Sequence, residues 1–481
     1  MKKSVKIISA SVIIIAVLIF LLPYLINANP KDIDLTIHLR GVYKSKINVI
    51  PLMGDKNPIA VINELKENNK ATISISSMHL PGEFLLHLEY YETESSSRAL
   101  SAEAMIILYK QDVEMWIHPL HINNLDSTYF HKKEKENTEF ISFMKKNNKN
   151  NEMLDLLQNF LFSYDDKDSD FYQSAVKELN KRRTEHNQWI DEKIEKNKGL
   201  FASSLFSLYY VPEITWTGSQ TELKQSYINN YFSHIDFNDT LLLKSSSFKP
   251  WMDNYVNLHV ELVKNPETTD SLFTMAGFNA IEKAKHGHPL VYGWVVDYFF
   301  NGYESLNIQK GIAMLAPYIA DPNCMTQKRQ EIERRLKGIT TLVPGVPAPN
   351  FDFEQDGNKF NFREFKTNAP YKLVLFWSAG CPHCVEMAKR VHKWYQQNNN
   401  QNKLEIFAIS LDEDDVDISE WKKLKSNMQG WHHILAEGGV NSPQANSYFI
   451  LSTPTLFIVE TKNNTITALP NNIREIEEAI K

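Results

Sequence analysis

The 481-residue chain is poor in cysteine and has no excess of basic residues. Its three cysteines, Cys324, Cys381 and Cys384, are too few to hold a disulfide-stapled scaffold together. The 52 Lys and Arg residues are outnumbered by 58 Asp and Glu residues, and no basic cluster is interleaved with aromatic residues as a nucleic-acid groove requires. We therefore expect no nucleic-acid partner, and a chemical role for the closely spaced cysteines.

Long hydrophobic runs are also scarce, with one exception near the N-terminus. Lys2, Lys3 and Lys6 precede an uncharged apolar run over residues 7–26. Its length favours a retained membrane anchor over a cleaved export signal, whose apolar region is usually about 7 to 15 residues long. Both interpretations of residues 1–28 stay open. In either case the lysines keep this end in the cytoplasm, so we expect the rest of the chain on the periplasmic side of the inner membrane.

The rest of the chain divides into three regions by the period of its apolar residues. Residues 30–125 hold short alternating segments between turn residues, which predicts an all-β, sandwich-like domain. A polar, Asn- and Lys-rich stretch follows, interpreted as a connection and a solvated helix. Residues 140–338 have a helical period and predict an all-α domain, with His286 and His288 as surface or capping side chains. Strands then alternate with helices over residues 343–481, which predicts an α/β domain in a multidomain protein.

The third region carries the motif Cys-Pro-His-Cys between a buried strand and a helix. Cys381 falls at the helix N-cap, Pro382 at the first helical position, and Cys384 one turn later, within disulfide reach. The unpaired N–H groups and the helix dipole favour a thiolate at Cys381, and a protonated His383 adds a positive charge beside it. We therefore expect Cys381 to be the exposed nucleophile and Cys384 the sheltered resolving thiol.

A second motif, Thr453-Pro454, immediately precedes a β-rich run. Taken alone, Pro454 is more simply a trans turn proline, because only about 5 to 6% of X–Pro bonds are cis. Together with the cysteine motif it predicts a cis bond that turns the backbone of Thr453 towards Cys381. The main chain there would pair with an extended substrate.

The segment FWSAGCPHC, followed by a helix, a strand and STPTLFIVE, resembles the thioredoxin superfamily. The segment VPAPNFDFEQDGNKFNF is similar to the lead-in hairpin of its TlpA/ResA-like exported branch, and the layout of the whole chain resembles multidomain envelope proteins of Bacteroidota. The resemblance implies a thioredoxin-like fold over residues 343–481, a redox-active Cys381–Cys384 disulfide and no separate cofactor. The predicted catalytic residues are Cys381, Cys384, His383 and Pro454, and the predicted substrate-contacting residues are Thr453, Trp377 and Pro382.

Several positions depart from the family pattern. Leu375 stands where many thioredoxins bury an acid, and Met387 where TlpA/ResA-like proteins carry a glutamate. Glu386 is one position away, so the group that takes the proton of the buried thiol is not assigned. Gly380 and Lys389 also replace common family residues. CPHC resembles the oxidising DsbA motif rather than the reducing CGPC of thioredoxin, but the direction of transfer stays open because it also depends on the partner.

Two other chemistries fit the cysteine pair less well. A half zinc site would need more ligands, and the sequence offers no second CxxC, only His432 and His433. A peroxidase is suggested by Ser378, three residues before Cys381, but Val374 stands where its motif has a proline. We therefore expect no metal, and we interpret Cys324 as a lone buried or capping thiol.

The sequence predicts a thiol-disulfide oxidoreductase that acts on protein thiols and disulfides of the cell envelope. A membrane or periplasmic electron donor or acceptor would renew its cysteine pair. The alternative is an envelope binding or assembly module, in which the N-terminal regions recognise a partner and the redox domain is accessory or structural. Turnover of a disulfide by the cysteine pair separates the two.

Overall fold

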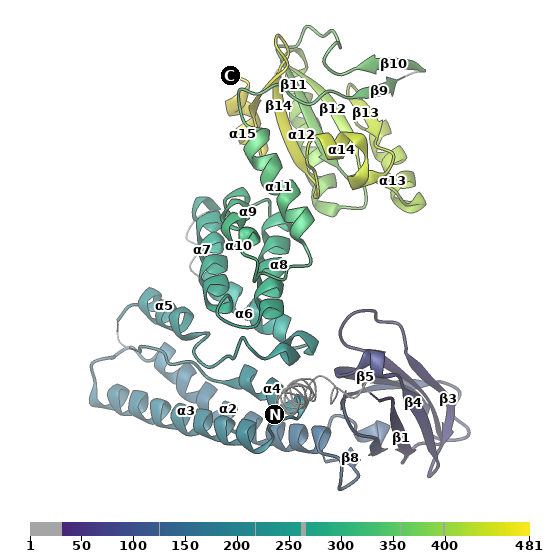
Figure 1. Cartoon of the computed structure of the whole chain (residues 1–481), viewed down its shortest axis with the longest axis vertical. Helices are drawn as coiled ribbons and strands as arrows, with labels where there is room; N and C mark the ends of the chain where they lie inside the picture. Colours follow the sequence, from purple (N-terminus) through teal and green to yellow (C-terminus); the bar gives the residue numbers. More distant parts are fainter. Residues whose placement is uncertain (1–30, 125, 217, 261–265, 356, 398–399) are drawn as a thin grey trace, which may run out of the picture. The chain divides into compact units, whose positions relative to one another are not determined.

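A computed structural model describes residues 31–124, 126–216, 218–260, 266–355, 357–397 and 400–481 (Figure 1). The chain separates into two compact units, Met1–Leu262 and Val263–Lys481. The predicted anchor or signal at residues 1–28 lies outside the described residues. Within the described ranges, no helix combines the length and the apolar character that a membrane span requires.

The N-terminal region is a β-sandwich, as the sequence predicted. One sheet has the strand order β4-β1-β7-β8 and the other β3-β2-β5-β6. Their facing side chains, among them Leu35, Val49 and Leu86, form one shared core. The strands are β1 (Ile33–Leu39), β2 (Lys44–Pro51), β3 (Ala60–Lys66), β4 (Lys70–Ile75), β5 (Gly82–Tyr91), β6 (Leu100–Leu108), β7 (Val113–Ile117) and β8 (Tyr129–Phe130).

Helices complete the first unit. The polar stretch expected to be a connection and a solvated helix belongs almost entirely to one helix of 28 residues, which begins at Glu136. The Glu136 carboxylate is buried, and it accepts hydrogen bonds from the N–H groups of Phe201 and Ala202, at 3.0 and 2.9 Å. These hydrogen bonds offset the cost of burying the carboxylate. The helices of this unit are α2 (Glu136–Ser163), α3 (Asp170–Lys196), α4 (Phe201–Phe206), α5 (Gln220–Asn230) and α6 (Phe248–Val260).

The second unit begins with further helices, which we call the helical segment: α7 (Pro266–Ala284), α8 (Pro289–Ser305), α9 (Gln309–Met314), α10 (Ala316–Ala320) and α11 (Arg329–Thr341). His288 caps α8, since its Nδ1 accepts a hydrogen bond from the N–H of Leu290 at 3.2 Å. The interpretation of His288 as a capping side chain is confirmed. Cys324 is buried, and its burial raises the pKa of its thiol to about 11, as expected of a lone structural thiol.

The C-terminal region of the second unit is a sheet covered on both faces, as predicted. The strand order is β13-β12-β11-β14-β15, with β11 parallel to β12 and antiparallel to β14. β11 is central and buried from Lys372 to Trp377, which explains its continuous apolar run. The strands are β11 (Tyr371–Trp377), β12 (Leu404–Ser410), β13 (His432–Leu435), β14 (Thr455–Glu460) and β15 (Thr465–Ala468).

Two separate apolar cores lie on the two faces of this sheet. Helices α12 (Pro382–Tyr395), α13 (Asp415–Ser426) and α15 (Ile473–Ala479) pack against one face. The lead-in hairpin and α14 (Pro443–Ser447) pack against the other. The hairpin pairs β9 (Asp352–Gln355) with β10 (Asn358–Asn361) through Gly357, whose φ of +77° suits glycine.

Strand β13 was not predicted, because it is short and opens with two histidines. His432 is buried in this strand and its Nε2 lies 2.7 Å from Glu405 Oε1 on the neighbouring strand β12. A hydrogen-bonded polar side chain thus fills a position where an apolar residue would have signalled a strand.

Candidate functional site

The redox motif lies where β11 ends and α12 begins. Cys381 is the N-cap residue, and its Sγ accepts a hydrogen bond from the N–H of Cys384 at 3.2 Å. Pro382 occupies the first helical turn, where its missing N–H leaves no unsatisfied donor. The sulfur of Cys381 therefore sits at the positive end of a 14-residue helix, an environment that favours a thiolate.

The two cysteines differ in exposure. Cys381 is half-buried, whereas Cys384 is fully buried beneath it. Burial, reinforced by the hydrogen bond with Cys381, raises the pKa of the Cys384 thiol. Cys384 is therefore held as a protonated thiol, and Cys381 is the sulfur that a partner can reach.

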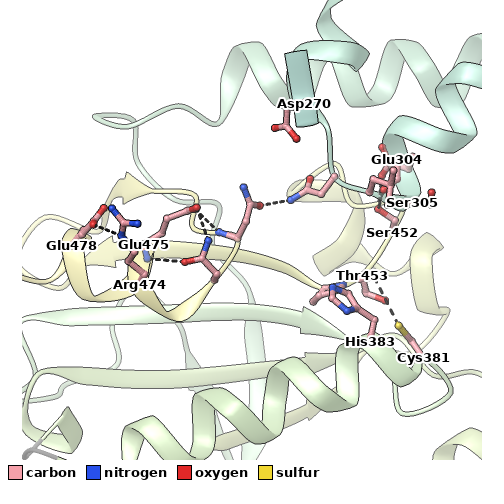
Figure 2. Close-up of a pocket in the computed structure, with 15 residues that line it drawn as sticks. Asp270, Glu304, Ser305, Cys381, His383, Ser452, Thr453, Arg474, Glu475 and Glu478 are labelled. Atoms are coloured by element: carbon pink, nitrogen blue, oxygen red, sulfur yellow. Dashed lines mark hydrogen bonds and ion pairs between the residues drawn. The ribbon is translucent and has the colours of Figure 1, made fainter. Parts of the chain in front are cut away.

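Thr453, which precedes β14, lies against the sulfur atoms of both cysteines at the start of α12. The Thr453–Pro454 peptide bond is cis, as the sequence predicted. The Thr453 carbonyl oxygen lies 4.0 Å from Cys381 Sγ (Figure 2). The Cys384 thiol donates to Thr453 Oγ1 at 3.2 Å. The structure thus brings the two predicted motifs together at one point.

Asp412 is a site residue that the sequence reasoning missed. It follows β12, is 4% exposed, and accepts hydrogen bonds from Ser378 Oγ at 2.6 Å and from the N–H of Ala379 at 2.9 Å. It thereby fixes the loop that leads into Cys381. A signal was available: β11 and β12 are parallel neighbours, so the residues that follow them meet at one edge of the sheet.

The expectation that Trp377 contacts substrate is wrong. Trp377 is 0% exposed and packs in the core beneath α12, because it is the last residue of the central strand. Glu386, the acid nearest to the family position in sequence, is exposed on α12 and forms an ion pair with Arg390 at 2.8 Å. Pro382 and His383 are exposed at the rim of the site.

A groove of about 1090 Å³ opens beside Cys381. Figure 2 shows that its lining comes from two parts of the second unit: Asp270 and Glu304 from the helical segment, and Cys381 and His383 from the α/β domain. Carboxylates dominate its charged lining, since Asp270, Glu304, Glu475 and Glu478 accompany one arginine, Arg474. Neither in this groove nor elsewhere in the described ranges is a group of three or more His, Cys, Asp or Glu side chains arranged to hold a metal ion.

A central sheet with helices on both faces, a Cys-x-x-Cys pair at a helix N-cap and a proline loop opposite it define a thioredoxin-like domain. A family model described as thioredoxin-like matches residues 370–466, within this domain. No curated protein matches the sequence.

Solved structures that resemble the chain include a thioredoxin-like protein from Bacteroides caccae, with 16% identity, coverage of 56% of this chain and 98% of that chain, and a TM-score of 0.38. The thioredoxin domain of a thiol-disulfide oxidoreductase from Bacteroides vulgatus has 23% identity, coverage of 29% and 99%, and a TM-score of 0.25. A thiol-disulfide oxidoreductase from Bacteroides fragilis has 26% identity, coverage of 28% and 98%, and a TM-score of 0.23.

Proposed function

We propose that the protein is a thiol-disulfide oxidoreductase that exchanges disulfides with proteins of the cell envelope through Cys381 and Cys384. The asymmetry of the pair carries the proposal. Cys381 is accessible at a helix N-terminus, while Cys384 is buried and its thiol pKa is raised by burial. One sulfur is thus placed to attack a partner and the other to release it.

In the reducing direction, the Cys381 thiolate attacks one sulfur of a substrate disulfide and expels the other as a thiolate, which takes up a proton. Cys384 then loses its proton and attacks Cys381 Sγ, which releases the second substrate thiolate. The cysteine pair gives up two electrons and becomes a disulfide, while the substrate disulfide becomes two thiols. The oxidising direction is the reverse, and a membrane or periplasmic donor or acceptor restores the starting state.

The groove supports a substrate segment in an extended conformation. Thr453 and Pro454 line the groove beside Cys381, and the backbone of this loop is where an extended strand would pair. The Thr453 carbonyl already faces Cys381 Sγ, at 4.0 Å. A substrate cysteine in such a segment would meet Cys381 at this end of the groove.

The proposal includes a location on the periplasmic side of the inner membrane. It rests on Lys2, Lys3, Lys6 and the apolar run that follows them. Protease added to spheroplasts should degrade the redox domain. Complete protection while the inner membrane is intact would contradict this location.

The redox function is tested with the full-length protein and insulin disulfides. We expect the reduced protein to release insulin thiols, and a Cys381→Ser variant to release none. A Cys384→Ser variant should accumulate mixed disulfides, whose substrate partners mass spectrometry would identify. If the wild type neither reduces insulin nor oxidises a dithiol peptide, the redox function fails and a binding module remains.

A further inference from the structure

Glu304, which lies outside the α/β domain, is bonded to the site. It is on α8, is 9% exposed, and its Oε2 accepts a hydrogen bond from Arg335 Nε on α11 at 2.8 Å. Its other carboxylate oxygen, Oε1, accepts a hydrogen bond from Ser452 Oγ at 2.6 Å. Glu304 and Arg335 form a buried ion pair. Each needs close hydrogen-bonding partners, because an unpaired buried charge destabilises the fold.

Ser452 links Glu304 to the cysteines through the next residue, Thr453. It directly precedes Thr453, and its own carbonyl oxygen accepts a hydrogen bond from Thr455 Oγ1 at 3.0 Å. Ser452 is therefore fixed on the side of the helical segment by Glu304 and on the side of β14 by Thr455. The next residue, Thr453, contacts the sulfur atoms of both cysteines.

The helical segment packs closely against the α/β domain through α11, which fixes the position of Glu304 and Arg335 relative to Ser452. Arg334 Nη2 donates to the carbonyl oxygens of Val440, Ala445 and Ile450 at 3.0, 3.1 and 2.6 Å. On the same helix, Gly338 approaches Phe449 so closely that an added Cβ would lie 2.8 Å from the phenylalanine Cβ. Arg335, between these two contacts, thus has a fixed position relative to Ser452.

We infer that Glu304 is a positioning residue of the redox site, which holds Thr453 opposite the two cysteines by way of Ser452. The inference rests on the proposed redox function. It makes the helical segment a part of that site, although the segment lies outside the matched residues 370–466.

The position of Thr453 bears on the redox equilibrium because its contacts depend on the oxidation state. Thr453 Oγ1 accepts the S–H of Cys384, and a disulfide has no S–H to donate. A correctly held Thr453 therefore stabilises the dithiol relative to the disulfide. Loss of the anchor should shift the pair towards the disulfide.

The test equilibrates the full-length protein with glutathione, in which protein dithiol and glutathione disulfide give protein disulfide and two glutathione molecules. We expect Ser452→Ala to raise the equilibrium constant for disulfide formation about fivefold, the usual worth of one hydrogen bond. Ser452→Thr keeps the hydroxyl group and should restore the wild-type constant. Glu304→Gln removes the charge that orients Ser452 and should shift the constant in the same direction as Ser452→Ala.

A matched control and a double-mutant cycle separate positioning from general packing. Ser447→Ala removes a half-buried hydroxyl group whose partner is Gln444 O, away from the cysteines, and should leave the constant unchanged.

The effects of Ser452→Ala and Glu304→Gln on the redox constant should be non-additive, because the two residues share one hydrogen bond. Variants that lower the free energy of unfolding but leave the redox constant within twofold of the wild type would overturn the inference and leave the redox function standing. A wild-type protein that forms no Cys381–Cys384 disulfide in glutathione would overturn the redox function itself.

Discussion

Thr453 Oγ1 lies 3.2 Å from the Sγ atom of Cys384, although 69 residues separate the two in the sequence. The antiparallel register of β11 and β14 explains the contact. Phe376, near the end of β11, pairs with Thr455 at the start of β14, so the residues before β14 lie beside the residues that open α12. The sheet thus brings the two motifs together without any covalent link.

Cys381 should react with iodoacetamide before Cys384. It is the more exposed of the two, while Cys384 is fully buried and its thiol pKa is raised by burial. At neutral pH we expect a rate difference of about tenfold or more, followed by peptide mapping so that Cys324 is counted separately. Preferential labelling of Cys384 would reverse the roles of the two cysteines.

Replacing His383 with Pro should make the reduction potential more negative. A protonated His383 at the exposed rim favours the Cys381 thiolate, and hence the reduced form, whereas the disulfide has no charge to stabilise. We expect the equilibrium constant with glutathione to shift about two- to fivefold towards the disulfide, and less at high salt. His383→Lys retains a charge and serves as the control. An unchanged or less negative potential in His383→Pro would mean that the helix terminus and the Thr453-Pro454 loop set the redox potential and that His383 does not.

Asp412→Ala should loosen the loop that carries Cys381. The substitution removes the buried carboxylate that accepts hydrogen bonds from the Ser378 hydroxyl and the Ala379 N–H. We expect a loss of about 2 to 3 kcal/mol in the free energy of unfolding by urea, and faster hydrogen exchange over residues 378–384. The adjacent, exposed Glu413→Ala should change stability by less than about 0.5 kcal/mol. Equal effects of the two substitutions would contradict a role for Asp412 in holding the loop.

Lys372 should make stability depend on pH in the alkaline range. Its side chain is buried in the central strand, where its Nζ donates to Phe362 O at 2.7 Å, and burial lowers its pKa from 10.5 to about 8. Below pH 8 the folded state bears the cost of a buried charge. Between pH 8 and 10.5 the unfolded chain binds the extra proton, so the folded state gains stability as pH rises.

The matched variant for this effect is Lys372→Met, which has no charge to bury. The free energy of unfolding of the wild type, relative to Lys372→Met, should rise by about 1 to 3 kcal/mol between pH 7 and pH 10. Urea unfolding at pH 7, 8.5 and 10 measures it. Parallel pH profiles for the two proteins would show that Lys372 titrates normally in the folded state.

Local sequence signals located the core of the site but not its surroundings. The N-cap position of Cys381 follows from neighbouring residues alone, and Thr453-Pro454 could be recognised beside it as a motif. Glu304 could not be predicted, because its role depends on how α8 and α11 dock on the α/β domain, which no local pattern encodes. Trp377 shows a different error. Its place in the motif predicted a contact with substrate, but the packing of β11 beneath α12 buries its side chain.

Arg334 donates its hydrogen bonds in the α/β domain to main-chain carbonyl groups, those of Val440, Ala445 and Ile450. Such a contact constrains the path of the backbone but not the identity of the three side chains. Substitutions at these positions that keep the fold therefore leave the three hydrogen bonds intact, and of the four residues only Arg334 needs its own side chain for them. A fragment cut at residue 343 loses these hydrogen bonds together with Glu304, so its redox potential would not be that of the whole chain.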